Sequence, residues 1–240
     1  LYVPRGASET SRVPCVLGVC GHSEVGKAED RYQRFCAGLA LKGFLVLIYD
    51  PIGQGERRLT DRRPPISNCV AEHVVLGSKL SLVGEYFGSY RAWDAVRALD
   101  VLLARPEADV RRVGMTGNSG GGTMTTMVTA LEDRLTMAAP SCFITTYRHN
   151  LENELQADTE QIPPGVIAEG LELYDHIAAA APRPTLILAK EDDFFDRRGV
   201  EEAYEKLSTV YRHLGSAHYL ELTIGTGGHG FDRDLREAMY

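Results

Sequence analysis

The stretch VGMTGNSGGG, residues 113–122, carries the strongest structural signal in the chain. A short apolar run breaks into glycines around Ser119 and continues as GGGTMTTMVTAL, which is compatible with a helix. A serine at the tip of a sharp strand-to-helix turn has a strained backbone, and side chains at Gly117 and Gly121 would collide with strand and helix. The pattern predicts a nucleophile elbow with Ser119 as candidate nucleophile. The alternative is an ordinary glycine-rich turn.

Short β-branched runs alternate with amphipathic stretches along the rest of the chain. This alternation predicts the α/β class: a mostly parallel central sheet with helices on both faces and functional groups at the carboxyl ends of the strands. The expected strands are 15–20, 44–49, 112–116, 135–139, 185–189 and 219–224. The expected helices, besides the one after Ser119, are 28–42, 89–104 and 199–214.

Length and composition favour one domain, since the chain has 240 residues of which 44% are hydrophobic. We expect residues 1–240 to be a single catalytic domain trimmed at both ends, because the chain begins at Leu1 and ends inside a helix-like segment. The connections 50–87 and 140–183 are long for a compact domain. We expect them to form walls or lids of a substrate pocket.

The charge and hydrophobicity of the chain indicate which classes of binding partner to expect. The formal net charge is −7, and no long basic run stands out, so we predict no nucleic-acid partner. The densest basic stretch, ERRLTDRR at 56–63, is most simply a solvated loop face, although a role in binding stays open. No apolar run has membrane length, so we predict no membrane partner. Nothing in these residues indicates an oligomeric state.

The five cysteines are odd in number and lack metal-site spacing, and Cys15 and Cys20 fall on an expected buried strand. We therefore expect small apolar residues rather than a disulfide framework. No histidine pair has HExxH-like spacing, so the sequence predicts a site without metal or other cofactor.

A serine nucleophile needs a base, and the base needs an acid to fix its tautomer. His229, in the GGHGF segment directly after the last expected strand, is the candidate base. Five further histidines are expected in surface or capping roles: His73, His149, His176, His213 and His218. The imidazole of His22 is interpreted as a packing group.

The acid should lie in KEDDFFD, residues 190–196, after the strand at 185–189. Asp193 is favoured over Asp192, because neighbouring side chains point in different directions and the following Phe-Phe can turn the Asp193 carboxylate inward. Glu191 and Asp192 should then be solvated, and Asp196 is a candidate cap of the next helix.

Charge developing on a carbonyl oxygen needs backbone N–H donors, and the candidates are Gly120 and His22. The segment around His22, GHSEVGKA at 21–28, also matches the phosphate-binding pattern GxxxxGK. However, Ala28 replaces the serine or threonine that would bind magnesium. A structural or ion-pairing role for Lys27 is therefore favoured over nucleotide binding.

Six collinear stretches together resemble the acetylxylan-esterase-like branch of the α/β-hydrolases: VLGVCGHSEVGKA, GFLVLIYDPIGQGER, AWDAVRALDVLLARPEADVRRVGMTGNSGGG, AAPSCF, DDFFDRRGVEEAYEKL and GGHGFDRDLREAMY. The resemblance implies an α/β-hydrolase fold, a triad of Ser119, Asp193 and His229, and an oxyanion hole at His22 and Gly120. It also implies hydrolysis of carboxylic esters, often acetyl groups on plant polysaccharides. The Asp192-Asp193 doublet departs from the family pattern and leaves the number of the acid open.

The resulting expectation is a cofactor-free serine carboxylesterase that acts on a small-molecule or carbohydrate ester such as acetylated xylan. A soluble protein, secreted or periplasmic, fits the resemblance. Two alternatives use the same fold. A serine peptidase of the prolyl-oligopeptidase kind has the same order of triad residues, and an inactive binding module would retain the fold without the reaction.

Overall fold

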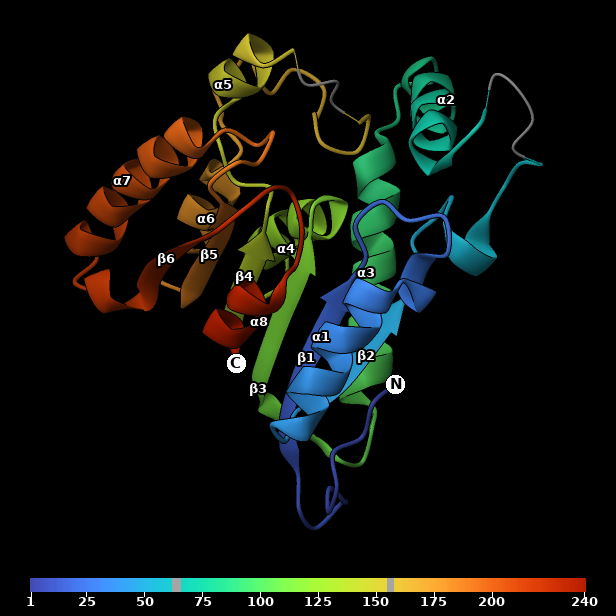
Figure 1. Cartoon of the computed structure of the whole chain (residues 1–240), viewed down its shortest axis with the longest axis vertical. Coiled ribbons are helices and arrows are strands. Elements are labelled where there is room, and N and C mark those ends of the chain that lie inside the picture. The colour runs from blue at the N-terminus through green and yellow to red at the C-terminus, as the bar shows by residue number, and fades with distance from the viewer. Residues whose placement is uncertain (62–65, 155–157) are drawn as a thin grey trace.

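The computed structural model describes residues 1–61, 66–154 and 158–240. Its centre is a six-stranded parallel sheet with strand order β2-β1-β3-β4-β5-β6 (Figure 1). The strands are β1 Val13–Val19, β2 Leu45–Tyr49, β3 Ala108–Asn118, β4 Met137–Ser141, β5 Thr185–Lys190 and β6 Leu220–Gly225. The predicted α/β class and all six predicted strands are confirmed, each within a few residues except the longer β3.

Helices cover both faces of the sheet because side chains of a strand alternate between its two faces. In β1, Leu17 and Val19 belong to the core beneath α3 and α4, whereas Val16 belongs to the core beneath α1 and α8. Figure 1 shows α1 and α8 in front of the sheet and α3 behind it. These helices are α1 Asp30–Leu41, α3 Phe87–Leu103, α4 Gly120–Leu131 and α8 Arg233–Met239.

The C-terminal half of the sheet has its own apolar core, which packs against α6 and α7. Helix α7 (Arg197–His213) buries Val200, Ala203, Leu207 and Tyr211, a stripe at helical spacing that made this helix predictable from the sequence. The predicted helices at 28–42, 89–104 and 199–214 are thus confirmed as α1, α3 and α7.

The two long connections contain helices that the sequence analysis did not assign: α2 Cys69–Ser81, α5 Tyr147–Glu152 and α6 Asp175–Ala180. In α2 the β-branched residues and Gly77 have low helix propensity, so the sequence does not indicate a helix there. The helix begins after Asn68, whose side chain accepts a hydrogen bond from Ala71 N–H. Three short 3₁₀ turns complete the elements: Gly26–Ala28, Gly55–Arg57 and Ala217–Tyr219.

The strand order places a switch point between β1 and β3. The chain leaves β1 toward β2 on one side and leaves β3 toward β4 on the other, so the loops after these neighbouring strands diverge. Ligands of parallel α/β sheets bind in the crevice that such diverging loops leave at the carboxyl ends. The loop with His22 and the turn with Ser119 both lie there.

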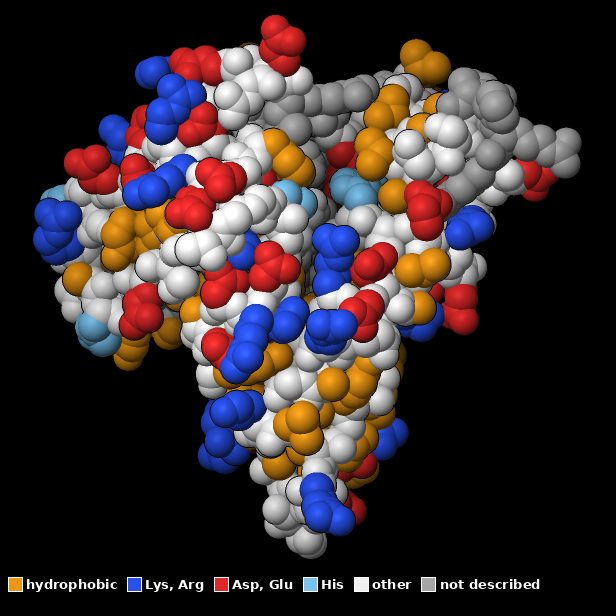
Figure 2. All heavy atoms as spheres, viewed as in Figure 1, with side chains coloured by type: hydrophobic (Ala, Val, Ile, Leu, Met, Phe, Trp, Pro, Cys, Tyr) orange, Lys and Arg blue, Asp and Glu red, His pale blue; other side chains and the backbone are white. Residues whose placement is uncertain are grey.

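Part of the basic stretch 56–63 falls on residues 62 and 63, outside the described residues. Of its described members, Arg57 contacts Asp94 and the Asp50 carbonyl, and Arg58 donates to the Glu24 carbonyl. On the face shown in Figure 2, basic and acidic side chains are intermixed. Within the described part of the chain, none of the helices has the length and apolar character required to cross a membrane.

Candidate active site

Ser119 sits between the end of β3 and the first residue of α4, in a conformation that non-glycine residues rarely adopt. Its φ and ψ are 60° and −122°, and its N–H donates to the Ser141 carbonyl at the end of β4 over 2.9 Å. Such strain persists only where the surroundings enforce it, and it clusters at functional sites. The predicted strand, turn and helix are confirmed as the local structure of this segment.

The glycines around Ser119 are required for close approach. A Cβ at Gly117 would lie 2.5 Å from the Val19 carbonyl oxygen and 2.7 Å from the Gly121 backbone. A Cβ at Gly121 would lie 2.2 Å from the same Val19 oxygen. The expected collisions with strand and helix are therefore confirmed, and they show how tightly α4 is held against β1.

The two candidate oxyanion donors lie on adjoining elements. Gly120 is the first residue of α4, so its N–H has no acceptor within the helix. The loop after β1 packs directly against the turn, because a Cβ at Gly21 would be 2.9 Å from Ser119 Cβ. His22 follows Gly21 and is thereby held beside Ser119. Developing negative charge at this position would also face the N-terminal end of α4.

His229 and Asp193, which are 36 residues apart, meet through a bifurcated hydrogen bond. His229 Nδ1 lies 2.9 Å and 3.0 Å from the two carboxylate oxygens of Asp193. An ionised carboxylate only accepts, so Nδ1 carries the proton and the neutral ring keeps its lone pair on Nε2. The Asp193 side chain is 1% exposed and that of His229 is 17% exposed. The pair thus combines a buried acceptor with a reachable imidazole.

The loop around Asp193 is braced on several sides. Asp193 accepts a hydrogen bond from Phe195 N–H (3.0 Å), and the Phe194 ring stacks on His229 with 4.2 Å between centroids. Asp192 is exposed, and its backbone N–H donates to the Gly227 carbonyl. Asp196 caps α7 by accepting from Arg198 N–H. Asp193 is therefore the carboxylate of this run that is hydrogen-bonded to His229 among the described residues.

Cys142 connects the His229 loop to the end of β4. It directly follows Ser141, has φ of 49°, and its thiol donates to the Gly230 carbonyl over 3.3 Å. Burial raises the pKa of this thiol to about 12, so it remains a neutral donor. Ser119 and His229 are in this way tied to the same strand end, although no hydrogen bond joins their side chains among the described residues.

Lys27, the lysine of the phosphate-binding pattern, lies between two carboxylates. Its Nζ is 2.7 Å from Asp50 Oδ2 and 2.7 Å from Glu56 Oε2. Burial alone would raise the pKa of Asp50, but hydrogen bonds from Glu56 N–H and from Lys27 outweigh it and lower that pKa. The predicted ion-pairing role of Lys27 is confirmed.

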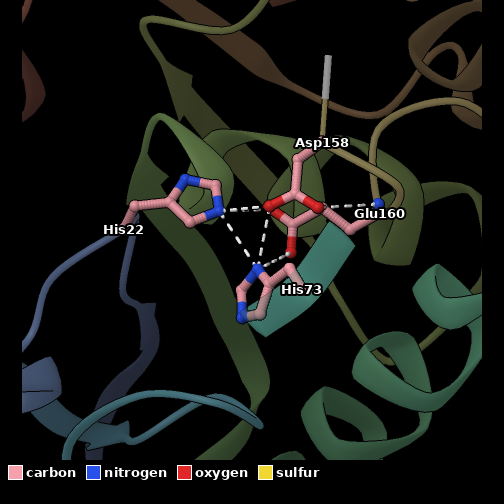
Figure 3. Close-up of side chains that lie close together, drawn as sticks. All are labelled: His22, His73, Asp158 and Glu160. Carbon is pink, nitrogen blue, oxygen red and sulfur yellow. Dashed lines mark hydrogen bonds and ion pairs between the residues drawn. The ribbon is translucent and has the colours of Figure 1, made fainter. Parts of the chain in front are cut away.

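A second polar cluster, which the sequence analysis missed, lies beside the turn and consists of His22, His73, Asp158 and Glu160 (Figure 3). Asp158 Oδ2 is 2.5 Å from His22 Nε2 and 2.8 Å from His73 Nδ1. The expectation that the His22 imidazole is mere packing is wrong, since it is bonded to a carboxylate. The surface or capping role expected for His73 is also wrong, because this side chain is 0% exposed on α2.

The electrostatics of this cluster follow from its burial. Burial lowers the pKa of His73, which outweighs the opposite effect of the Asp158 carboxylate. Burial would raise the pKa of Asp158, but hydrogen bonds with His22 and His73 outweigh it and lower that pKa strongly. Asp158 is therefore a buried carboxylate held in its ionised form.

Glu160 joins the cluster to α3 through an ion pair with Arg91, whose side chain is likewise buried. The cluster also borders the turn, because a Cβ at Gly120 would lie 2.7 Å from Glu160 Oε1 and 3.3 Å from His22 Cε1. Figure 2 shows histidine side chains on both sides of a hollow in this face of the molecule. The four residues come from three distant segments, so no local motif in the sequence announces them.

Residues 1–161 match the model of the acetyl xylan esterase (AXE1) family. The chain belongs to this family of esterases. The matched residues include Ser119 and its flanking glycines, and they also include all four residues of the buried cluster. Asp193 and His229 lie beyond them. The resemblance to acetylxylan-esterase-like α/β-hydrolases is thereby confirmed.

Similarity to individual proteins agrees with the family. The chain is 26% identical over 219 residues to the Bacillus subtilis (strain 168) protein named "Putative hydrolase YtaP", covering 87% of this chain and 68% of that protein. Among solved structures, the methylesterase BT1017 superposes with a TM-score of 0.73 at 23% identity, covering 99% of this chain and 49% of that one. A family 15 glucuronoyl esterase from Caldicellulosiruptor kristjansonii gives a TM-score of 0.64 at 16% identity, covering 99% and 69%. The chain thus spans about half of the methylesterase, and these two structures establish the α/β-hydrolase fold.

Proposed function

We propose that this chain is a serine carboxylesterase that works through an acyl-enzyme, with Ser119 as nucleophile, His229 as base and Asp193 as the residue that orients His229. The observation that carries the proposal is the His229–Asp193 pair, which leaves Nε2 free to accept a proton at the sheet edge where Ser119 has φ of 60°. A serine hydroxyl, a base and a buried acid in this order are the requirements of nucleophilic acyl transfer.

The reaction assigns one role to each group. Ser119 Oγ attacks the ester carbonyl while His229 Nε2 takes its proton, and the backbone N–H groups of Gly120 and His22 donate to the oxygen that becomes negative. His229 then returns the proton to the leaving alcohol, and water attacks the acyl-enzyme by the same route. Asp193 stabilises the imidazolium formed in both steps. Proton transfer requires Nε2 to lie within hydrogen-bond distance of Oγ in the complex with substrate.

The substrate class we propose is an acetylated carbohydrate such as acetylated xylan. The family description names this activity, and the connection 140–183 supplies Glu160, which lies beside Gly120. We further propose that residues 1–240 act as one catalytic domain whose long connections form the walls of the substrate pocket.

Labelling with a fluorophosphonate tests the nucleophile. The wild-type chain should be labelled at Ser119, and the Ser119→Ala variant should not be labelled at all. Absence of labelling in a folded wild-type chain would contradict the proposal and favour the inactive binding module.

A release assay tests the reaction and the substrate. We expect acetate release from acetylated xylan and turnover of p-nitrophenyl acetate. Methyl glucuronoyl esters, in which the sugar supplies the acid and not the alcohol, are the comparison substrates. Cleavage of proline-containing peptides in preference to these esters would overturn the esterase proposal in favour of a peptidase.

A further inference from the structure

The cluster beside Ser119 brings four potential metal ligands together from three separate segments. His22 lies in the loop after β1, His73 on α2, and Asp158 and Glu160 in the connection before α6 (Figure 3). One donor atom from each of the four lies within 4.8 Å of every other. Asp158 and His73 are also buried, so these side chains are directed at one another and not at solvent.

The hydrogen bond between His73 and the Ile52 carbonyl fixes which ring nitrogen of His73 faces the cluster. Nε2 lies 2.8 Å from the Ile52 carbonyl oxygen, which can only accept, so Nε2 carries the proton. In the neutral ring Nδ1 is then an acceptor, yet it lies 2.8 Å from Asp158 Oδ2, another acceptor. The short contact therefore holds a positive charge in either case: a proton on Nδ1, which makes the ring a double donor, or a metal ion bound by both atoms. Histidines bound to metals typically donate their second ring N–H to a backbone carbonyl in this way.

Glu160 provides a further unused donor. Its Oε1 is buried and has no hydrogen-bond partner among the described residues, and it lies 3.7 Å from His22 Nε2. A buried carboxylate oxygen left in this state is costly, because it has lost its water and gained nothing in exchange. Arg91 pairs with Glu160, whereas Asp158 forms ion pairs only with the two histidines among the described residues.

The spacing fits a small ion. Tetrahedral zinc with bonds of about 2.0–2.2 Å separates its ligand atoms by roughly 3.3 Å. Among His22 Nε2, His73 Nδ1 and Asp158 Oδ2 the separations are 2.5, 2.8 and 3.2 Å, and Glu160 Oε1 lies 3.7 Å from His22 Nε2, so the values lie on both sides of that distance. Calcium and magnesium prefer oxygen ligands alone, whereas two imidazoles with two carboxylates suit zinc and its first-row neighbours.

We propose that His22, His73, Asp158 and Glu160 bind one divalent transition-metal ion, with zinc as the best match. The ion would fasten α2 and the 158–160 segment to the loop that presents the His22 N–H beside Gly120. This site departs from the metal-independent prediction, which considered only ligands spaced within one local motif. It stands apart from the proposed esterase function, since it requires nothing of Ser119.

The test is zinc binding to the whole chain after treatment with a chelator, measured by titration calorimetry and by metal content after gel filtration. We expect one equivalent of zinc and a rise in the melting temperature, because an ion that binds only the folded state stabilises it. Loss of a ligand in His73→Ala or Asp158→Asn should weaken zinc binding at least about 100-fold. The Asp158→Asn side chain has nearly the same shape, and circular dichroism checks that each variant is folded.

Three matched variants make the test specific. Cys142, Asp193 and His229 also lie within 4.8 Å of one another, so His229→Ala asks whether zinc binds there instead. His149→Ala removes a buried histidine outside both groups, and Ser119→Ala abolishes the proposed reaction alone. All three should retain one equivalent of zinc. The proposal is overturned if the wild type takes up no zinc, if folded Asp158→Asn binds it as tightly as wild type, or if His229→Ala alone loses it.

Discussion

The structure brings together two groups of histidine and carboxylate side chains, and they differ in which ring nitrogens stay available for further bonds. In the His229–Asp193 pair the carboxylate bonds to one ring nitrogen, and the other nitrogen has no hydrogen-bond partner among the described residues, on a side chain that is 17% exposed. In the cluster around His73 the ring is fully buried, and both of its nitrogens face oxygen acceptors. An imidazole of the first kind can exchange protons with a substrate, whereas one of the second kind is suited to hold a structure or an ion. The same residue types therefore support different chemistry in the two groups.

The largest effect that bears on this comparison is expected at Ser119. Ser119→Ala should lower kcat for p-nitrophenyl acetate by roughly 10⁴-fold to 10⁶-fold, because the nucleophile is lost while the oxyanion donors remain. Steady-state kinetics measure the loss, and a melting curve shows whether the fold is retained. A decrease of less than tenfold would mean that the hydroxyl is not the nucleophile.

Asp193 should come next. Asp193→Asn is expected to lower kcat by roughly 10⁴-fold, since an amide can no longer hold His229 in the tautomer with a free Nε2. Asp192→Asn is the matched control and should stay within about threefold of wild type, because Asp192 is exposed and lies outside the pair. Similar losses in both variants would remove the distinction drawn here between the two aspartates.

The reactivity of Cys142 shows whether an ionised thiol competes with Asp193 for the hydrogen bond of His229. Its pKa of about 12 in the folded chain, against about 8.5 for a free thiol, lowers the thiolate fraction at pH 8 by roughly 10³-fold. Alkylation of Cys142 by iodoacetamide at pH 8 should therefore be slow in the folded protein and fast in denaturant, as peptide mass spectrometry would show. Rapid reaction of the folded chain would place an ionised sulfur beside His229 and weaken the comparison.

The smallest effect is expected from the buried ion pair. In the metal-free protein, Arg91→Met should lower the free energy of unfolding by about 3 kcal/mol, because Glu160 then keeps an uncompensated charge inside the protein. Arg233→Met breaks the exposed pair with Glu237 and should cost at most about 0.5 kcal/mol. Denaturant unfolding of both variants gives the two values. Equal values would show that the cluster is not the desolvated environment described here.

The architecture was largely predictable because it depends on short-range regularities. Apolar β-branched runs predict strands such as β1, and one apolar stripe at helical spacing predicts α7. The turn at Ser119 was predictable for a steric reason, since only glycine fits at Gly117 and Gly121. Helix α2 was not, because β-branched residues and a glycine in its interior argue against a helix, and tertiary packing overrides them.

The candidate site was likewise predictable only in part. Residue order along the chain was enough to nominate Ser119, His229 and the acidic run 190–196, since each follows a strand whose carboxyl end lies at one edge of a parallel sheet. Which carboxylate faces His229 depends on how the loop folds, and only the structure shows that Asp193 does.

The amino-acid sequence by itself determined the class of fold and the strained turn, because these rest on periodicity and on steric rules that act over a few residues. It also indicated the family, through the resemblance of six collinear stretches. The tertiary structure alone decided that His22 and His73 meet Asp158 and Glu160 next to Gly120. Such a cluster has no local signature, since its members are spread from residue 22 to residue 160 and its charges are stable only where folding excludes water and provides partners.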